Sequence, residues 1–440
     1  MSDEASSDHE HDQDSIKVAT ALSTLDDPID AALQVSDRIK QQLGSAPDLL
    51  MVFVTIHHAR RMGMIADTLR DRLSSKHMMG ITASGVMSGP THIEDGPGLS
   101  VMACRFPGVD IKPFWIDHLS PRASVEERAA ALSDQIGATD DMKATIFFAD
   151  PFSVPLVNLV PALSAARMQV VSSSGRIDHI GTILGGMASA GDRPNTNTLL
   201  LDGEIRNSGA MGVTLSGPIQ IDTIVSQGCR PIGQPMVITK ARGNLILELA
   251  GTRAVDAIRE VVSGLRPEDQ QLLANGLVMG RVINENKSYF GRGDFLIRNI
   301  MGGDEESGAV AIADLIHAGQ TVQLHLHDHQ TAREDLSLLL DGQRLYDKPA
   351  GAMVISCSGR NDAFFEESES SQSGYDARTI YSAFDPKPDG ANLAKGGHEL
   401  DIQQGIPVSG FLAAGEIGPV DGKIFQHGHT AVVAVFRQPQ

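Results

Sequence analysis

Aromatic side chains and basic charge are both scarce in this chain of 440 residues. Phe, Trp and Tyr make up 4% of it, which leaves few rings on which nucleic-acid bases could stack. Lys and Arg number 36 against 55 Asp and Glu, and the net charge of −19 opposes binding to phosphate backbones and anionic membranes. We therefore expect no nucleic-acid partner and no membrane partner.

Cysteine is also scarce, because Cys104, Cys229 and Cys357 are the only three and lie far apart. Such spacing does not indicate a disulfide framework. The acidic start lacks the basic and apolar regions of a signal peptide, and no apolar run is long enough to span a bilayer. These features predict a cytoplasmic protein. Motifs of nucleotide loops, dinucleotide sites, zinc proteases and serine hydrolases are absent, so we expect no cofactor and regard an enzyme as the less favoured class.

The length of the chain exceeds the usual size of one hydrophobic core, so two domains are expected. Residues 1–16 are acidic and almost free of apolar side chains, which predicts a disordered tail. Gly and Pro are frequent in the stretch SQGCRPIGQP, and we place the main boundary there. The predicted domains are residues 17–226 and 227–440.

One hexamer occurs three times, at residues 80–85, 186–191 and 410–415, with the pattern Gly, apolar, any, small, small, Gly. A strand-like apolar run precedes each copy, and a glycine turn with a further apolar run follows it. The intervals have helical periodicity, as in residues 62–73. We predict three copies of a strand–helix–strand–turn–strand unit. The fold class is then α/β or mixed α+β, with layered sheets and flanking helices.

The third repeat hexamer is followed directly by Glu416, a carboxylate in a glycine-rich stretch. It could cap the turn, or it could bind an amine or guanidinium group in a pocket. If the three units are real, the loops at 355–360, 415–419 and 425–430 should meet at one end of a sheet. This would gather Cys357, Ser358, Arg360, Glu416, His427 and His429.

Such a group of side chains could hold a zwitterion, with Arg360 binding a carboxylate and Glu416 binding an ammonium group. It could also support covalent chemistry, with Cys357 as the nucleophile and His427 as the base. A buried, inert Cys357 is the simpler alternative, since free cysteines are often buried.

Two further patterns carry polar residues in apolar strands. Arg298 and Asn299 lie either on a solvated face or in a polar cavity. The stretch HLHDH, residues 325–329, places three histidines on one face of a strand, which suggests zinc. Their spacing of about 7 Å along a strand is too wide for one ion, and we expect no metal.

Several of these stretches together resemble the FIST domain. They include LLMVFVTIHH, LGGMASA, VSQGCRPIGQPMVITKARGN, LIRNIMG, HLHD, GAMVISCSGR, GFLAAGEIGPV and FQHGHTAVVAVF, and the resemblance covers about residues 45–437. Relatives tend to read H-x-R-D where this chain has His327 in place of the arginine. The ligand-binding residues that the motifs indicate are Cys357, Ser358, Arg360, Gly415, Glu416, Gly418 and His427. We add Arg298 and Asn299 to these candidates from their place in an apolar strand.

The FIST resemblance implies an intracellular sensory domain whose suspected ligands are amino acids or related metabolites. No fused signalling segment is recognisable, so we expect a stand-alone sensor whose output passes through a protein partner or through oligomerisation. One alternative is a protein-interaction module, as F-box relatives suggest, with an exposed apolar patch and no well-formed pocket. Another alternative is an enzyme that uses Cys357.

Overall fold

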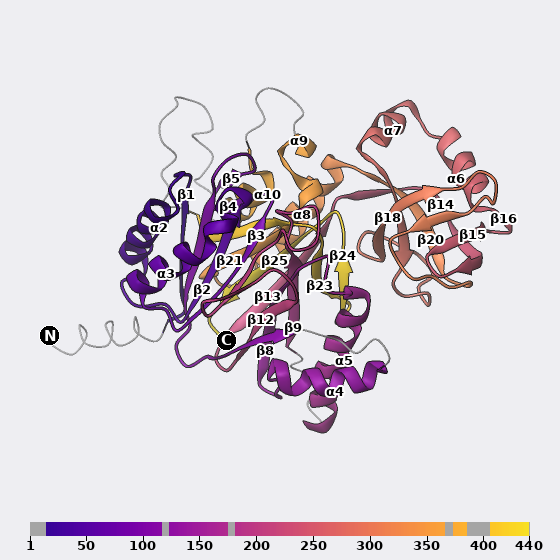
Figure 1. Cartoon of the computed structure of the whole chain (residues 1–440). Coiled ribbons are helices and arrows are strands. Elements are labelled where there is room, and N and C mark those ends of the chain that lie inside the picture. Colours follow the sequence, from indigo (N-terminus) through magenta and orange to yellow (C-terminus); the bar gives the residue numbers. More distant parts are fainter. Residues whose placement is uncertain (1–14, 117–122, 175–180, 366–372, 385–404, 440) are drawn as a thin grey trace.

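The computed structural model describes residues 15–116, 123–174, 181–365, 373–384 and 405–439 (Figure 1). The predicted disordered tail, residues 1–16, lies almost entirely outside this part of the chain. Among the described residues, no helix is long and apolar enough to cross a membrane. The predicted domain division after residue 226 stays a prediction.

Three units of one design form the larger part of the molecule, and the mixed α+β class is confirmed. In each unit a central strand pairs in parallel with a second strand and antiparallel with the last strand, and helices flank the sheet. Unit 1 contains β1 (Lys17–Ser23), α2 (Pro28–Leu43), β2 (Leu49–Thr55), η1 (Ile56–Arg61), α3 (Met62–Leu73), β3 (His77–Ala83), β4 (Val86–Ser88), β5 (Thr91–Ile93) and β6 (Leu99–Arg105). Unit 2 contains β7 (Asp110–Ile116), α4 (Val125–Ile136), β8 (Met142–Ala149), α5 (Leu156–Ser174), β9 (Thr182–Met187), β10 (Leu199–Leu201), β11 (Glu204–Arg206) and β12 (Ala210–Ser216). Unit 3 contains β13 (Gln220–Gln227), α8 (His329–Gln343), β21 (Gly351–Cys357), η3 (Ser358–Arg360), α9 (Asp362–Phe365), α10 (Tyr375–Ala383), β22 (Val408–Ala413), β23 (Glu416–Val420), β24 (Lys423–His427) and β25 (Thr430–Arg437).

A further sheet interrupts unit 3 between β13 and α8, and we call residues 229–327 the barrel insert. Its strands follow the order β14-β20-β17-β18-β19-β15-β16, and an additional pairing of β14 with β15 closes them on one another. The insert lies to one side of the three units (Figure 1). Its elements are β14 (Cys229–Arg242), β15 (Leu245–Leu249), β16 (Thr252–Arg253), α6 (Ala254–Ser263), α7 (Pro267–Leu272), η2 (Leu273–Asn275), β17 (Leu277–Val282), β18 (Phe295–Gly303), β19 (Val310–Ile312) and β20 (Thr321–His327).

The short hairpin of each unit leaves its own sheet and extends the sheet of another unit. Hairpin β4–β5 of unit 1 pairs with β22 of unit 3, and β10–β11 of unit 2 pairs with β3 of unit 1. Hairpin β23–β24 of unit 3 completes the cycle by pairing with β9 of unit 2. This exchange gives the units a three-fold arrangement, and it carries Glu416, the first residue of β23, out of its own sheet.

The inner faces of the three sheets enclose one shared apolar core. Phe53 of β2, Phe148 of β8 and Phe411 of β22 meet there with ring centroids 5.1, 5.3 and 5.9 Å apart. Gly186 leaves room for one of these rings, because a Cβ at that position would lie 3.1 Å from the ring of Phe411. The core therefore depends on all three units at once.

Tight backbone packing explains the glycine that begins each repeat hexamer. A Cβ on Gly410 or Gly185 would lie 1.9 Å from a carbonyl oxygen of the neighbouring central strand, and one on Gly80 would lie 2.6 Å away. The second predicted hexamer, 186–191, therefore begins one residue too late, since Gly185 and not Gly186 makes this contact. The one-residue shift also brings three strand-end alanines into register, Ala83, Ala188 and Ala413.

Candidate functional site

One edge of the third sheet gathers the ends of several strands. Strand β21 is parallel to β22 and antiparallel to β25, so Cys357, the turn after β22 and Thr430 lie at the same edge. Strand β23 begins beyond that turn with Glu416, and the barrel insert reaches the same place through His327 at the end of β20. We call the following residues the polar cluster: His327, Cys357, Arg360, Glu416 and His429.

Glu416 is completely buried, with 0% of its surface exposed. Its Oε2 accepts hydrogen bonds from Oγ1 and N of Thr430, at 2.6 and 3.2 Å, while its Oε1 has no hydrogen-bond partner among the described residues. It begins a strand and binds a residue of β25, so the interpretation of Glu416 as a turn cap is wrong. Burial raises the pKa of Glu416 to about 8, and the two Thr430 hydrogen bonds offset only part of this effect.

Arg360 is held by an ion pair inside the protein. Its side chain is 0% exposed, and its Nε and Nη2 donate to the carboxylate of Asp376 at 2.9 and 2.7 Å. Burial opposes the charge of the guanidinium, but Asp376 outweighs it and the pKa of Arg360 is raised. Two of the guanidinium nitrogens are thus engaged, and Nη1 is left without a partner in the described part of the chain.

Two imidazole rings close the cluster from the side of the barrel insert. His327 stacks on Phe364 with centroids 3.9 Å apart, and His429 meets His327 edge-on at 4.3 Å. Burial lowers the pKa of both histidines, and the charge of Arg360 lowers it further, so both rings are neutral near pH 7. His429 also has a φ of 58°, a conformation that costs a non-glycine residue energy and is often found at functional sites.

Cys357 is buried beside these groups as a protonated thiol. Burial raises its pKa, and the neighbouring carboxyl of Glu416 raises it further. A thiolate is the reactive form of cysteine, and this environment disfavours it. His427, the base that was predicted for a nucleophilic Cys357, has its Nε2 3.1 Å from the carbonyl oxygen of Gly418. The geometry therefore does not favour a catalytic cysteine.

Four buried polar atoms of the cluster have no hydrogen-bond partner among the described residues: Glu416 Oε1, Arg360 Nη1, His327 Nε2 and His429 Nδ1. These atoms belong to one neighbourhood. A Cβ on Gly359 would lie 3.4 Å from His429 Nδ1, 3.7 Å from Cys357 Sγ and 3.7 Å from His327 Cε1. Most buried polar atoms in native proteins do have partners, so such a concentration needs an explanation. Together the four atoms offer a cationic donor, a carboxyl oxygen and two neutral imidazole nitrogens.

Arg298 and Asn299 lie in two different places although they are neighbours on β18. Asn299 places its Oδ1 2.8 Å from Nε2 of His429 and so stands at the rim of the polar cluster. Arg298 donates to Asp314 and to the carbonyl oxygen of Gln426, at 3.0 Å each, and lines a separate cleft. The two residues that were predicted together therefore belong to different sites: Asn299 lies beside the polar cluster, and Arg298 lines the separate cleft.

The remaining residues that were predicted to bind the ligand are His427, Gly418, Gly415 and Ser358, and the first three are closely packed. His427 lies opposite Glu416 in the β23–β24 register, and burial lowers its pKa to about 4. A Cβ on Gly418 would lie 2.9 Å from a methyl group of Val225, and one on Gly415 would lie 2.3 Å from the end of a methionine side chain. Ser358 is half-buried in η3.

The three histidines of residues 325–329 have different neighbours. His325 packs against Phe295, His327 belongs to the polar cluster, and His329 begins α8. A set with metal-ligand chemistry lies elsewhere in the described part of the chain, where His92, Glu94 and Asp362 bring ligand atoms within 4.8 Å of one another. Their observed contacts are ion pairs that join hairpin β4–β5 to the segment after η3.

Sequence reasoning missed part of this site. It considered His327 as a metal ligand and as a departure from H-x-R-D, but did not place it beside Cys357 and Arg360. Thr430 completes the HGHT motif, and it binds Glu416 directly. Asp376 and Phe364 had no sequence signal, because a helix residue that pairs with a buried arginine looks like any other charged residue before the fold is known.

Comparison with known proteins assigns most of the chain to one family. A family model described as the FIST N domain matches residues 48–252, and one described as the FIST C domain matches residues 254–380. The uncharacterized protein Rv0628c of Mycobacterium tuberculosis is 30% identical over 428 residues, which cover 96% of this chain and 100% of that protein. The uncharacterized protein Mb0898c of Mycobacterium bovis is 30% identical, with 96% of this chain and 99% of that protein covered.

Comparison with solved structures gives a match to the crystal structure of a chorismatase. It covers 96% of this chain and 99% of its own, with 7% sequence identity and a TM-score of 0.33. A likeness at this level carries no argument about activity.

Proposed function

This chain belongs to the FIST domain family, and from that premise we propose that it is a cytoplasmic sensory protein that binds an amino acid or a related metabolite in the polar cluster. FIST domains are generally sensory, ligand-binding domains of signal transduction. The observation that supports the proposed site is the group of four polar atoms without partners among the described residues. A ligand that pairs with them removes the free-energy cost of leaving them unsatisfied.

The chemistry of the cluster fits both ends of a zwitterion. Nη1 of Arg360 is a charged donor suited to a carboxylate. Glu416, whose burial raises its pKa to about 8, is protonated at neutral pH and ionises when an ammonium group binds beside it. Binding near pH 7 should therefore release a proton. The neutral rings of His327 and His429 can each donate or accept one further hydrogen bond.

A cysteine enzyme receives less support than a sensor. The thiol of Cys357 is buried, and burial raises its pKa, so little thiolate is present near pH 7. Glu416, the carboxyl group beside the thiol, is itself mostly protonated near pH 7 and is therefore poorly suited to accept the thiol proton.

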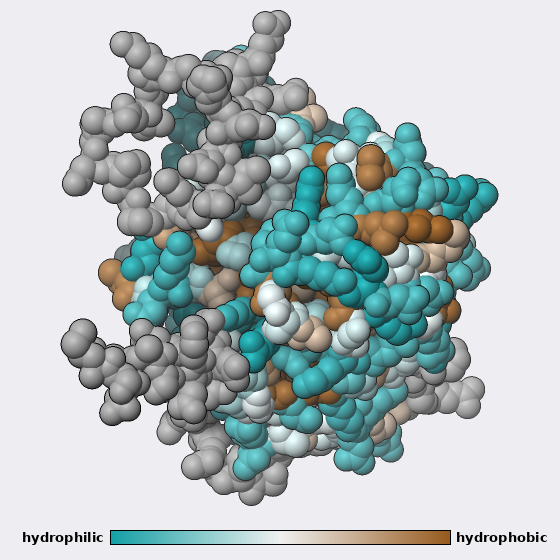
Figure 2. Space-filling model, turned by 90° about the vertical axis from the view of Figure 1, so that its left-hand side faces the viewer, coloured by the Kyte–Doolittle hydropathy of each residue, from teal (hydrophilic) through white to brown (hydrophobic). Residues whose placement is uncertain are grey.

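A protein-interaction module, the other alternative, calls for a continuous exposed apolar patch. On the face shown in Figure 2, hydrophilic side chains predominate and hydrophobic ones occur in separate small areas. That face gives an interaction module no particular support. A protein partner for signal output remains part of the proposal.

A thermal-shift screen against amino acids, small amines and small carboxylates tests the proposal. A ligand at a hundred times its Kd adds about 2.7 kcal/mol to stability, which raises the melting temperature by several degrees. We expect a shift with at least one amino-acid-like compound in the wild type and its loss in Glu416→Gln. Glu204→Gln is the matched control, since it removes an exposed carboxylate from β11 of another exchanged hairpin. A shift that persists in Glu416→Gln would place the ligand elsewhere.

A further inference from the structure

A second cleft, separate from the polar cluster, lies between helix α5, hairpin β23–β24 and the barrel insert, with a volume of about 970 Å³. Figure 1 shows α5 and β24 on the side of the three units that faces the insert. The volume is in the range of cavities that bind small molecules. Its charged lining residues are Arg167, Arg281, Arg298, Asp314, Asp421 and Lys423.

One side of this cleft is apolar and open to solvent. Val157 and Met168 of α5 are 48% and 42% exposed, and Leu315, which follows β19, is 54% exposed. Single exposed apolar side chains are common on proteins, but these three line the same cavity. An apolar molecule in the cleft would cover them and gain the free energy of burial.

Another part of the lining has an excess of positive charge. Arg281 and Arg298 both direct Nε to the same oxygen of Asp314, at 3.0 Å each. Nη1 of Arg298 donates to the carbonyl oxygens of Ile297 and Gln426, at 2.9 and 3.0 Å. No partner among the described residues engages Nη2 of Arg298 or either Nη of Arg281. Two guanidinium groups thus share one carboxylate, and donors remain free in the cleft.

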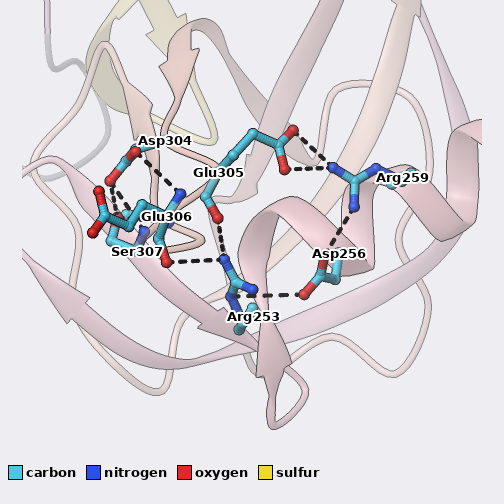
Figure 3. A network of polar contacts seen from close by, with 8 residues as sticks. Arg253, Asp256, Arg259, Asp304, Glu305, Glu306 and Ser307 are labelled. Carbon is cyan, nitrogen blue, oxygen red and sulfur yellow. Dashed lines mark hydrogen bonds and ion pairs between the residues drawn. The ribbon is translucent and has the colours of Figure 1, made fainter.

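In an exposed arginine network of the barrel insert, the arginines and the carboxylates that pair with them are equal in number (Figure 3). There Arg253 and Arg259 meet the carboxylates of Asp256 and Glu305, so two cations face two anions. The cleft differs because its pair of arginines has half as many carboxylates. In a chain whose net charge is −19, a local excess of cations suggests an anionic ligand.

We propose that this cleft binds a small apolar molecule with one acidic group, such as a medium-chain or aromatic carboxylic acid. The acid group pairs with the free guanidinium nitrogens of Arg281 and Arg298, and the apolar body covers Val157, Met168 and Leu315. The lining has four basic residues, Arg167, Arg281, Arg298 and Lys423, against the two carboxylates of Asp314 and Asp421, and this excess of positive charge suits an acidic group. This site does not depend on Glu416, so it stands apart from the function proposed above.

A displacement experiment on the full chain tests this site. The anionic dye anilinonaphthalene sulfonate is bound first, and dodecanoate or the uncharged dodecanamide is then titrated in. We expect dodecanoate to displace the dye at about tenfold lower concentration than dodecanamide, because only dodecanoate gains the charge-assisted hydrogen bonds. The double variant Arg281→Gln/Arg298→Gln should remove this preference and leave the affinity for dodecanamide unchanged.

Matched variants make each outcome decisive. Arg259→Gln removes an arginine from the network in Figure 3 and should leave both affinities unchanged, as should Glu416→Gln. Val157→Asp changes an exposed residue, so the fold should persist while both ligands bind more weakly. The proposal is overturned if the wild type binds no dye, if dodecanoate and dodecanamide bind equally, or if Val157→Asp leaves both affinities intact.

Discussion

The ends of the three central strands occupy equivalent places in the three units but meet different surroundings. In unit 1, Thr55 donates to the carbonyl of Gly96 and accepts from the amide of Gly98, at 2.9 Å each. In unit 2, both carboxylate oxygens of Asp150 accept side-chain hydrogen bonds. In unit 3, Cys357 lies instead among four atoms that no described residue satisfies. In units 1 and 2 the strand-end residues thus have hydrogen-bond partners, although the buried ring of His58, just after β2, has none among the described residues.

The residue after the third repeat hexamer shows the same contrast. Glu416 follows the hexamer in unit 3, whereas the equivalent residue of unit 1 is Val86, a buried apolar residue that begins β4. Both residues lie where a hairpin crosses into another sheet. A carboxyl group at that crossing is costly to bury, and stability alone does not account for it. We take this departure from the repeat as the mark of function.

The largest effects should come from the packing that the units share. Gly410→Ala and Gly185→Ala each place a Cβ 1.9 Å from a carbonyl oxygen, so each should destabilise the protein by about 3 kcal/mol or more. Gly342→Ala is the control, since nothing lies within 4 Å of its Cβ and helix α8 should gain about 1 kcal/mol. Urea unfolding measures all three. If Gly185→Ala were well tolerated, the second repeat hexamer would begin at Gly186, as the sequence predicted, and not at Gly185.

A slightly smaller effect should follow from breaking the ion pair beneath the polar cluster. Asp376→Asn leaves Arg360 buried without a counter-charge and should cost about 3 kcal/mol in urea unfolding. Asp256→Asn in the exposed network of Figure 3 should cost less than about 1 kcal/mol. If the two variants proved equal, the Arg360–Asp376 pair would not be the buried support that the structure indicates.

The pH dependence of stability separates unit 3 from the other units. Burial raises the pKa of Glu416 to about 8 from an ordinary value of 4.5, so the folded protein retains a proton that the unfolded chain releases between these values. Stability should therefore fall as pH rises through this range. Glu416→Gln cannot ionise, and its stability relative to the wild type should increase by on the order of a few kcal/mol between about pH 5 and pH 8.5.

The measurement for this prediction is urea unfolding at several pH values. Glu204→Gln, which removes an exposed carboxylate from β11, should run parallel to the wild type throughout. A Glu416→Gln curve that is also parallel to the wild type would show that Glu416 ionises normally.

The smallest expected difference in stability is between substitutions at the ends of the central strands of units 1 and 3. Thr55→Val removes the partner of two backbone groups and should cost about 2 kcal/mol. Cys357→Ala removes a thiol whose contacts with Glu416 and with the backbone of Gly359 and His429 are weak hydrogen bonds, and it should cost about 1 kcal/mol or less. Thermal unfolding ranks the two variants, and the reverse order would make Cys357 a structural residue of the same kind as Thr55.

Much of the fold could be predicted from repetition in the sequence. The apolar runs and repeat hexamers predicted three similar units, and the helical face of Met62, Ile65, Leu69 and Leu73 is buried as expected. The exchange of hairpins could not be predicted, because strand partners from distant units leave no local pattern. The register of Gly185 was missed for a related reason, since two adjacent glycines fit the pattern equally well until their neighbours are known.

The candidate site could be predicted only in part. Strand-end motifs placed Cys357, Arg360 and Glu416 together, as the structure has them. Arg298 was predicted together with Asn299, but neighbouring residues of a strand face opposite sides, and only Asn299 lies beside the cluster. Arg360 was predicted to bind a ligand carboxylate, and the sequence did not indicate that Asp376 occupies two of its nitrogens, because Asp376 comes from a helix that no motif marked.

Equilibrium dialysis against a radiolabelled mixture of the common amino acids tests the ligand role of the polar cluster most directly, because the result does not depend on which amino acid binds. The wild type and Glu204→Gln should retain label at a stoichiometry near one per chain, while Glu416→Gln should retain none above background. Equal retention by the wild type and Glu416→Gln, or no retention by any folded form, would contradict the assignment of this cluster as an amino-acid site.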